Sequence, residues 1–526
     1  MTELGLTTGF NVALVAGIFG VIWKLRSRVL VDLISALLIG LLGLMTVFGE
    51  NDPQAASIHL QVLMSPFVQV MQGDTLLVDL PSQYGLFPQL LAPIFHVTGL
   101  SILSFTIVMS LLSSISLLLI YLTMRRLVTN PVLLLLGFSA LVSSVCFWGR
   151  FKGLDESGVD PNFQYWPVRT LFPTIAMAFV IQHVAKPSAV TRWAGHILMS
   201  FGCLWNLDSG LPAWGAWVAY LLYRSTHWRG FIHEATVALG ILSVVITTYT
   251  LAVWLSSGQW PSAGLMFASH KVFAYAGYYM LPARLIHPWN LVIIVYIAAM
   301  CWSTRIWLGE RHVDGAIVFS LTVLGTGLFT YYVGRNHDLV FPVTTYPMFV
   351  IVLVYLNKLF SSGKQSGPLR RSAGFIAASL MFILTVGMIG KLAILSDQAL
   401  RRSAAISSPR TERATQIVDL VEQKSGGAEK LLFLSDHATY WHLLTNIAAT
   451  TNDNLATMFY QTEIDELALA LVRGDTPVFV DGYFDQPRRD KRNSVYPQLL
   501  STLKEAGYQP LAVTKDQTFS YWSIPQ

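Results

Sequence analysis

Two acidic residues stand where an apolar segment ends. Residues 29–48 are mostly apolar, and Gly49-Glu50-Asn51-Asp52 follows directly. A carboxylate this close to hydrocarbon is unfavourable unless it faces water or serves a function. Held in place, it can remove a proton from an attacking hydroxyl, or supply a hard oxygen ligand to a divalent cation such as Mg²⁺ or Mn²⁺. The alternative is an ordinary polar helix end at the membrane boundary.

Further polar side chains lie between the other apolar runs. Ionisable residues at membrane depth are functional candidates by default, whereas aromatic residues there often only anchor the chain at the interface. Arginine is the side chain best suited to bind phosphate, because its planar fork contacts two oxygens at once. The candidates in these segments are Gln83, Tyr84, Asp160, Tyr165, Arg169, Asp208, Lys271, Arg284, Arg335 and His337.

The elements that must position these residues are membrane-spanning helices. The chain is 53% hydrophobic and only 12% charged, which is too little charge to cover a soluble protein of this size. A span needs roughly 20 apolar residues, and this length predicts about twelve spans. They are expected near residues 8–24, 29–48, 99–122, 131–148, 167–185, 193–207, 210–223, 232–256, 288–307, 313–333, 340–360 and 373–395.

The distribution of Lys and Arg predicts the orientation of these spans. With the spans above, every basic cluster falls on one side, which the positive-inside rule assigns to the cytoplasm. The clusters are Lys24/Arg26/Arg28, Arg125/Arg126, Lys186/Arg192, Arg224/Arg229, Arg305/Arg311 and Lys364/Arg370/Arg371. All the candidate residues then lie on the opposite, outer side, together with the chain after residue 396. The net charge of +5 is spread over loops, so nucleic acid is not an expected partner.

The first long outer loop contains a second recognisable pattern. Apolar residues recur at helical spacing between residues 58 and 72, with polar residues opposite them. This pattern predicts an amphipathic helix lying in the membrane interface. The loop continues through Ser82-Gln83-Tyr84-Gly85 into the next span.

This order of motifs resembles the first outer loop of GT-C glycosyltransferases, which take sugar from a polyprenyl-phosphate donor. Glu50-Asn51-Asp52 matches their Asp/Glu-x-Asp motif, and Gln83-Tyr84-Gly85 matches a segment that often precedes the next span. In this chain the acidic loop follows the second predicted span, whereas in the family it usually follows the first. The resemblance implies a polytopic α-helical, GT-C-like membrane fold, an inverting glycosyltransferase of EC class 2.4, and a polyprenyl-phosphate-linked sugar as donor substrate.

The resemblance also suggests a role for each candidate. Asp52 is expected to be the general base that deprotonates the acceptor, with Glu50 as second catalytic carboxylate. Glu50 and Asp52 are also tentative ligands for Mg²⁺ or Mn²⁺. The donor phosphate is assigned to Arg335, His337, Lys271 and Arg284. Substrate binding is assigned to Gln83, Tyr84, Asp160, Tyr165, Arg169 and Asp208.

The C-terminal part has a different pattern. Short apolar runs at 431–434, 477–480 and 518–522 alternate with helical patterns at 411–423 and 496–506, which predicts a small α/β domain. We expect a transmembrane domain at 1–396 and an extracytoplasmic, periplasmic domain at 397–526. Asp436, His437, Tyr440, Trp441 and His442 are possible contacts for a sugar acceptor, or ordinary parts of the domain surface.

Three functions are compatible with the sequence. The first is the glycosyltransferase, placed in a bacterial inner membrane and acting on an extracytoplasmic glycan, lipid or protein in cell envelope biogenesis. The second is a transporter or flippase for a lipid-linked or small polar substrate, although the sequence contains no pair of similar halves of the kind many transporters have. The third is a non-catalytic scaffold whose C-terminal domain binds partners.

Overall fold

A computed structural model of the chain describes most of its 526 residues. The described ranges are 12–13, 16–17, 20, 24, 27–49, 58–147, 163–225, 227–275, 277, 280–309, 313–338, 340–361, 367–406, 410–453, 461–473, 476–482 and 495–525. Within them the protein is mostly helical, and a small sheet lies near the C-terminus. The predicted span at 8–24 falls largely outside these ranges, as do Glu50, Asp52 and Asp160.

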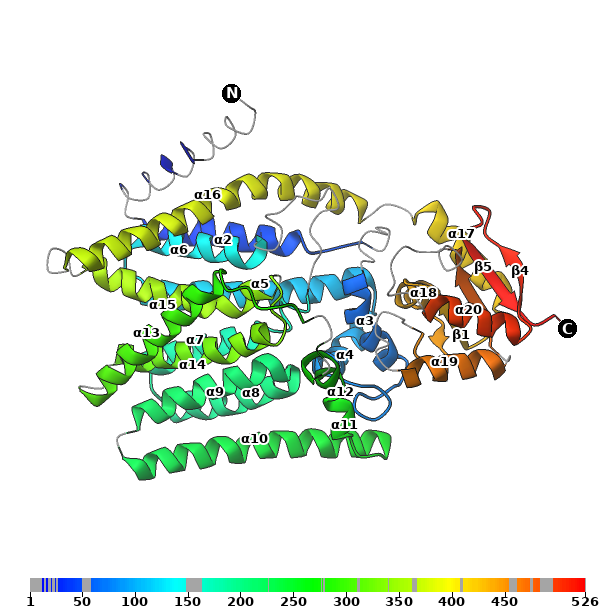
Figure 1. Cartoon of the computed structure of the whole chain (residues 1–526), viewed down its shortest axis with the longest axis horizontal. Helices are drawn as coiled ribbons and strands as arrows, with labels where there is room; N and C mark the ends of the chain where they lie inside the picture. Colours follow the sequence, from blue (N-terminus) through cyan, green and yellow to red (C-terminus); the bar gives the residue numbers. More distant parts are fainter. Residues whose placement is uncertain are drawn as a thin grey trace.

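A bundle of long helices runs horizontally in Figure 1, with α16 along its upper edge and α10 along its lower edge. Helices occur at all the predicted spans from 29–48 onward. They are α2 (Arg28–Leu44), α5 (Ile102–Leu127), α6 (Pro131–Phe147), α7 (Leu171–Ala185), α8 (Ala189–Trp205), α9 (Leu207–Arg224), α10 (Trp228–Ser257), α13 (Trp289–Leu308), α14 (Val313–Val333), α15 (Phe341–Ser361) and α16 (Pro368–Ala405).

Six segments in the described part are long and apolar enough to cross a membrane. They are α5, α10, α13, α14, α15 and residues Arg370–Met388 of α16. The two apolar segments Pro131–Ser144 and Leu171–Ala185 are shorter. The protein therefore has membrane-spanning helices by length and composition, and the count of about twelve spans stays a prediction.

One end of the bundle collects the basic connections between helices. Arg28 Nη2 donates to the carbonyl of Thr129 at 2.8 Å, and the Thr129 amide donates to Asn357 Oδ1 at 3.0 Å. Lys358 then pairs with Asp314 at 2.7 Å. These contacts tie the starts of α2 and α14 to the ends of α5 and α15. We call this the basic end, defined by Arg28, Arg126, Arg192, Arg224, Arg229 and Arg305.

The opposite end carries the shorter helices and the C-terminal domain (Figure 1). It contains α3 (Ile58–Met71), α4 (Phe87–Thr98), α11 (Ala263–Met266), α12 (Ala268–His270) and the single π-helical turn η2 (Lys271–Tyr275). The helix predicted at 58–72 corresponds to α3. Phe67 of α3 is fully buried against the rings of Phe87, Phe95 and Phe105, so this helix is fixed to the bundle by aromatic packing.

The C-terminal domain is built on a five-stranded sheet of order β2-β1-β3-β5-β4. Its strands are β1 (Lys430–Leu434), β2 (Ala448–Ala449), β3 (Val478–Asp481), β4 (Gln509–Val513) and β5 (Phe519–Ser523). β1 is parallel to β2 and β3, whereas β5 is antiparallel to β3 and β4. The helices are α17 (Glu412–Lys424), α18 (Ala438–Thr445), α19 (Gln461–Arg473) and α20 (Val495–Glu505). Phe433, Phe479 and Phe519 form its aromatic centre.

Three side chains of helix α18 differ from the expectation that they contact a sugar acceptor at the domain surface. Tyr440 and Trp441 on α18 are buried, and Trp441 packs edge-to-face on Phe519. His442 is also buried, and its ring nitrogens contact the Ile447 carbonyl and the Asp453 carboxylate. These three side chains belong to the domain interior, because α18 lies directly between β1 and the bundle. His437 at its start hydrogen-bonds Gln61 of α3, which docks the domain on α3.

Candidate functional site

Polar residues from five distant parts of the chain surround one cavity at the domain end of the bundle. Its volume is about 180 Å³. The lining comes from the loop before α4, the turn before α7, the first turn of α9, the α12–η2 segment and the end of α14. Polar or charged lining side chains include Gln83, Tyr84, Arg169, Asp208, Ser269, His270, Tyr331 and Arg335.

A buried ion pair lies at the centre of this site. Arg169, only 3% exposed, places Nη2 at 3.3 Å from Asp208 Oδ2 and donates through Nη1 to the Gln164 carbonyl at 2.6 Å. The other carboxylate oxygen of Asp208 lies 2.8 Å from His270 Nε2. One carboxylate thus holds two cationic side chains. The hydrogen bond to Asp208, opposed by burial, raises the pKa of His270, so His270 carries positive charge at higher pH than an ordinary histidine.

Aromatic rings orient the two arginines. The guanidinium of Arg169 lies 4.2 Å from the ring centroid of Tyr331 and 5.3 Å from that of Tyr84. Arg335 lies 4.0 Å from the Phe273 centroid. Cation–π contacts of this kind favour a fixed guanidinium. Arg335 forms no ion pair with any residue in the described ranges, so its charge, unlike that of Arg169, is not matched by a carboxylate there.

A tight helical hairpin places Asp208 in the site. α8 ends at Trp205, and Asn206 begins α9 by accepting the Ser209 amide at 3.0 Å. Asn206 also donates to the Tyr84 carbonyl at 2.6 Å. The hairpin closes because Gly210 lies so near Gly202 that a Cβ would stand 2.0 Å from its carbonyl oxygen. The same asparagine therefore aligns Asp208 and Tyr84.

Gly85 lets the loop before α4 reach this hairpin. Its φ is +114°, and a Cβ there would stand 1.9 Å from the Trp205 carbonyl oxygen. The amide of Gly85 donates to Ser82 Oγ at 3.0 Å, and the next amide, that of Leu86, donates to the Leu204 carbonyl at 3.0 Å. The backbone of the Gln83-Tyr84-Gly85 motif thus crosses the α8–α9 hairpin at Gly85, and only glycine fits at that position.

A smaller cavity of about 50 Å³ lies on the other side of Gln83 and Tyr84. Ser65 and Gln69 of α3 line it together with Ser269. The C-terminal domain contributes Asn452 and Glu463 to the same lining. Bundle and domain therefore meet at a polar crevice beside the main cavity.

The predicted residues fall into three groups. Gln83, Tyr84, Arg169, Asp208 and Arg335 line the main cavity together. Tyr165 is electrostatically coupled to Arg169, Tyr84, Tyr331 and Arg335, and burial raises its pKa. Lys271 is exposed, Arg284 pairs with Asp338 at 3.6 Å, and neither lines the cavity. His337 is half-buried and also stands outside the lining. Glu50, Asp52 and Asp160 lie outside the described residues, so their roles stay predictions.

Sequence reasoning did not select six residues of the lining, and three of these contact the charged groups of the site. His270 stands next to the candidate Lys271 in the sequence, but only the fold shows that His270, and not Lys271, lines the cavity. Tyr331 lies in the last turn of α14, and Arg335 follows just after this helix ends at Val333, so both stand in the same outer segment of the sequence. No sequence signal distinguishes Phe273, because many other phenylalanines of this chain also stand in apolar segments.

The described residues do not themselves form a metal site. No three His, Cys, Asp or Glu side chains gather within the ranges that the structure covers. Both oxygens of Asp208 already contact Arg169 and His270. A divalent cation held by Glu50 and Asp52 stays a prediction, and no step below depends on it.

Two solved structures are similar to this chain. One is ArnT from Cupriavidus metallidurans bound to undecaprenyl phosphate, with 11% identity, a TM-score of 0.49, and coverage of 95% of this chain and 99% of that one. The other is ArnT from the same organism in the apo state, with 12% identity, a TM-score of 0.42, and coverage of 96% and 99%. Comparison with protein-family profiles gives no match, and comparison with curated protein sequences gives none.

ArnT is a GT-C polyprenyl-phosphate-dependent glycosyltransferase. At these identities and TM-scores, the similarity assigns no substrate, reaction or residue role to the present chain.

The crossing at Gly85 yields a stability prediction. Gly85→Ala should lower the free energy of unfolding by roughly 1–3 kcal/mol, because Cβ would collide with the Trp205 carbonyl. The measurement is the thermal unfolding midpoint of the detergent-solubilised protein, which should fall. Gly73→Ala is the matched control, since Gly73 has a similar φ of +107° but no atom within 4 Å of its Cβ position. Equal destabilisation by the two variants would contradict the crossing.

Proposed function

We propose that the protein is a GT-C-type, inverting membrane glycosyltransferase. It would move a sugar from a polyprenyl-phosphate donor to an extracytoplasmic glycan, lipid or protein acceptor. The observation that carries this proposal is the cavity in which Arg335, with no ion-pair partner in the described part, stands beside Arg169 and His270. Asp208 is the single carboxylate in the described lining, so the cavity has a net positive charge suited to an anionic phosphate.

The donor phosphate is best placed against Arg335. A half-buried guanidinium whose ring contact with Phe273 fixes its plane can present two N–H groups to phosphate oxygens. His270, held by Asp208, adds a second donor to the lining of the same cavity. As the bond between the anomeric carbon and the phosphate oxygen breaks, these groups stabilise the charge that develops on the departing polyprenyl phosphate.

The acceptor hydroxyl needs a base, and that role is proposed for Asp52. The acceptor oxygen would form the new bond to the anomeric carbon in one displacement, with inversion, while its proton passes to the Asp52 carboxylate. Residues 50–57 connect α2 to α3, and α3 lines the smaller cavity through Ser65 and Gln69. The acidic segment is therefore tethered on both sides to elements at the domain end of the bundle.

The smaller cavity is the proposed acceptor approach. It adjoins the main cavity across Gln83 and Tyr84, and it includes Asn452 and Glu463 of the C-terminal domain. Amide and carboxylate groups of this kind bind sugar hydroxyls by hydrogen bonds. We place the enzyme in a bacterial inner membrane, with the basic end toward the cytoplasm by the positive-inside rule and the C-terminal domain on the periplasmic side.

Removing the charge of Arg335 should weaken use of the donor. Arg335→Gln is expected to lower kcat/KM for the polyprenyl-phosphate sugar about 10- to 100-fold, as for loss of one hydrogen bond to a charged group. The measurement is sugar transfer by protein reconstituted in liposomes. Arg284→Gln is the matched control, because Arg284 is 61% exposed and outside the lining. An equal effect of the two variants would remove Arg335 from phosphate binding.

Donor binding should also depend on pH through His270. Its raised pKa means that the positive charge is present below that pKa and is lost as pH rises through it, so the KM for donor should increase there. The increase should be at most about tenfold. His270→Gln should flatten the part of the profile that lies above the ordinary histidine pKa of about 6.5. Burial lowers the pKa of His337 and raises that of Tyr84 to about 12, so neither group mimics this change. A profile unchanged in His270→Gln would contradict the assignment.

Asp52→Asn tests the proposed base. The variant should lose sugar transfer by a factor of roughly 10² to 10⁴ in kcat, with expression and donor binding retained. Asp74→Asn is the control, since Asp74 is an exposed carboxylate beyond the end of α3 and lines neither cavity. Full activity of Asp52→Asn would exclude Asp52 as the base.

A further inference from the structure

A third cavity, of about 750 Å³, lies at the basic end of the bundle, far from the candidate active site. It opens between the α7–α8 and α9–α10 connections. Its ionisable lining consists of His183, Arg192, Arg224, His227, Arg229 and Glu234. None of these residues takes part in the proposed glycosyl transfer.

The charges in this cavity are not balanced. Glu234 is the single carboxylate in the described lining, and it pairs with Arg192 at 2.8 Å. Arg224 and Arg229 are exposed and form no ion pair within the ranges that the structure covers. Two uncompensated guanidinium groups therefore line the same hollow, an arrangement that suits phosphate oxygens.

Backbone and side-chain N–H donors also favour binding of an anion in this cavity. The buried Nε of Arg192 has no hydrogen-bond partner in the described part of the chain. The 30-residue helix α10 begins at Trp228, and the side chain of its N-cap residue, His227, does not cap it. Trp228, Arg229 and Gly230 of this first turn line the cavity. The free N–H groups of a helix N-terminus attract anions.

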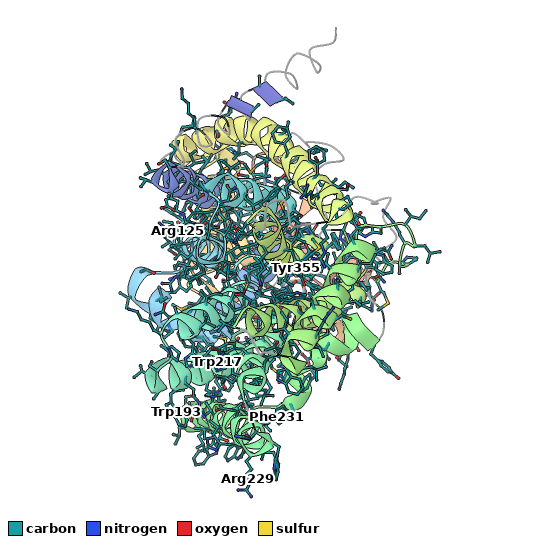
Figure 2. All side chains as sticks on the ribbon, turned by 90° about the vertical axis from the view of Figure 1, so that its left-hand side faces the viewer. Arg125, Trp193, Trp217, Arg229, Phe231 and Tyr355 are labelled. Carbon is teal, nitrogen blue, oxygen red and sulfur yellow. The ribbon has the colours of Figure 1, made fainter. Side chains whose placement is uncertain are left out.

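The surroundings of the cavity indicate a lipid rather than a soluble anion. α10 lies at the edge of the bundle (Figure 1), and its candidate membrane window is only 11% buried. Trp228 is 70% exposed. Trp193 and Phe231 lie near Arg229 at the lower edge of this end (Figure 2) and are also exposed. Exposed tryptophans above an apolar helix face mark the headgroup level of a membrane.

We propose that this cavity binds the phosphate of an anionic phospholipid headgroup, with the acyl chains along the outer face of α10. Arg224 and Arg229 contact the phosphate, and the first turn of α10 supplies backbone N–H donors. Basic pockets between membrane helices are suited to such headgroups. This site is separate from the donor cavity and does not depend on the proposed enzyme activity.

The test is binding of phosphatidylglycerol to the full-length protein in detergent, measured by native mass spectrometry. Arg224→Gln combined with Arg229→Gln should weaken retention of one lipid by at least about tenfold, as expected for two arginines beside a phosphate. Arg229→Gln alone, at an exposed position, should give a smaller loss without affecting folding. The matched control is Arg126→Gln with Arg305→Gln, which removes two exposed charges from the same end but outside the cavity.

Three results would overturn the proposal. The first is equal loss of phosphatidylglycerol in the pocket and control variants, which would indicate attraction to the basic end as a whole. The second is equal retention of zwitterionic phosphatidylcholine by the wild-type protein. The third is displacement of the bound lipid by millimolar inorganic phosphate, which would identify a soluble anion as the occupant.

Discussion

The candidate site depends on one buried charge. Arg169 is almost fully enclosed, and a buried guanidinium is tolerated only when it is paired and hydrogen-bonded. Asp208 and the Gln164 carbonyl supply those contacts, and Asp208 also holds His270. The turn before α7, the start of α9 and the α12 segment are therefore held together by one carboxylate. Because that carboxylate is shared, the second arginine, Arg335, is left as the charge available to a ligand.

The two ends of the bundle have different chemistry for a common physical reason. Hydrocarbon excludes charge along the middle of the helices, so ionisable residues gather where the chain leaves it. At the domain end they converge on the cavity of about 180 Å³, and the C-terminal domain lines the smaller cavity beside it. At the basic end the larger cavity lies at the start of α10, whose apolar face is mostly exposed. That position favours contact with the membrane.

The sequence alone predicted the helices well, because apolar runs of span length have few other structures available to them. The predicted range 313–333 coincides with α14, and 288–307 differs from α13 by one residue at each end. Helix α4 was not predicted, since Pro88 and Pro93 interrupt an otherwise short apolar run. In the C-terminal domain, the buried strands β1 and β3 were predicted from their apolar runs. The exposed edge strand β4 was not, because its apolar run covers only residues 511–513 and follows Pro510, a residue that disfavours a strand.

Sequence determined which residue types stand at the ends of the helices, and hence that arginine, aspartate and tyrosine are available where chemistry is possible. It also indicated that Gln83-Tyr84-Gly85 is a special segment. Tertiary structure alone decided which of these residues meet. Arg169, Asp208, His270 and Arg335 are separated by between 39 and 65 positions from their neighbours in this group, and local periodicity carries no information over such distances. Only the packing of α8 on α9, and of both against the Gly85 crossing, places them around one cavity.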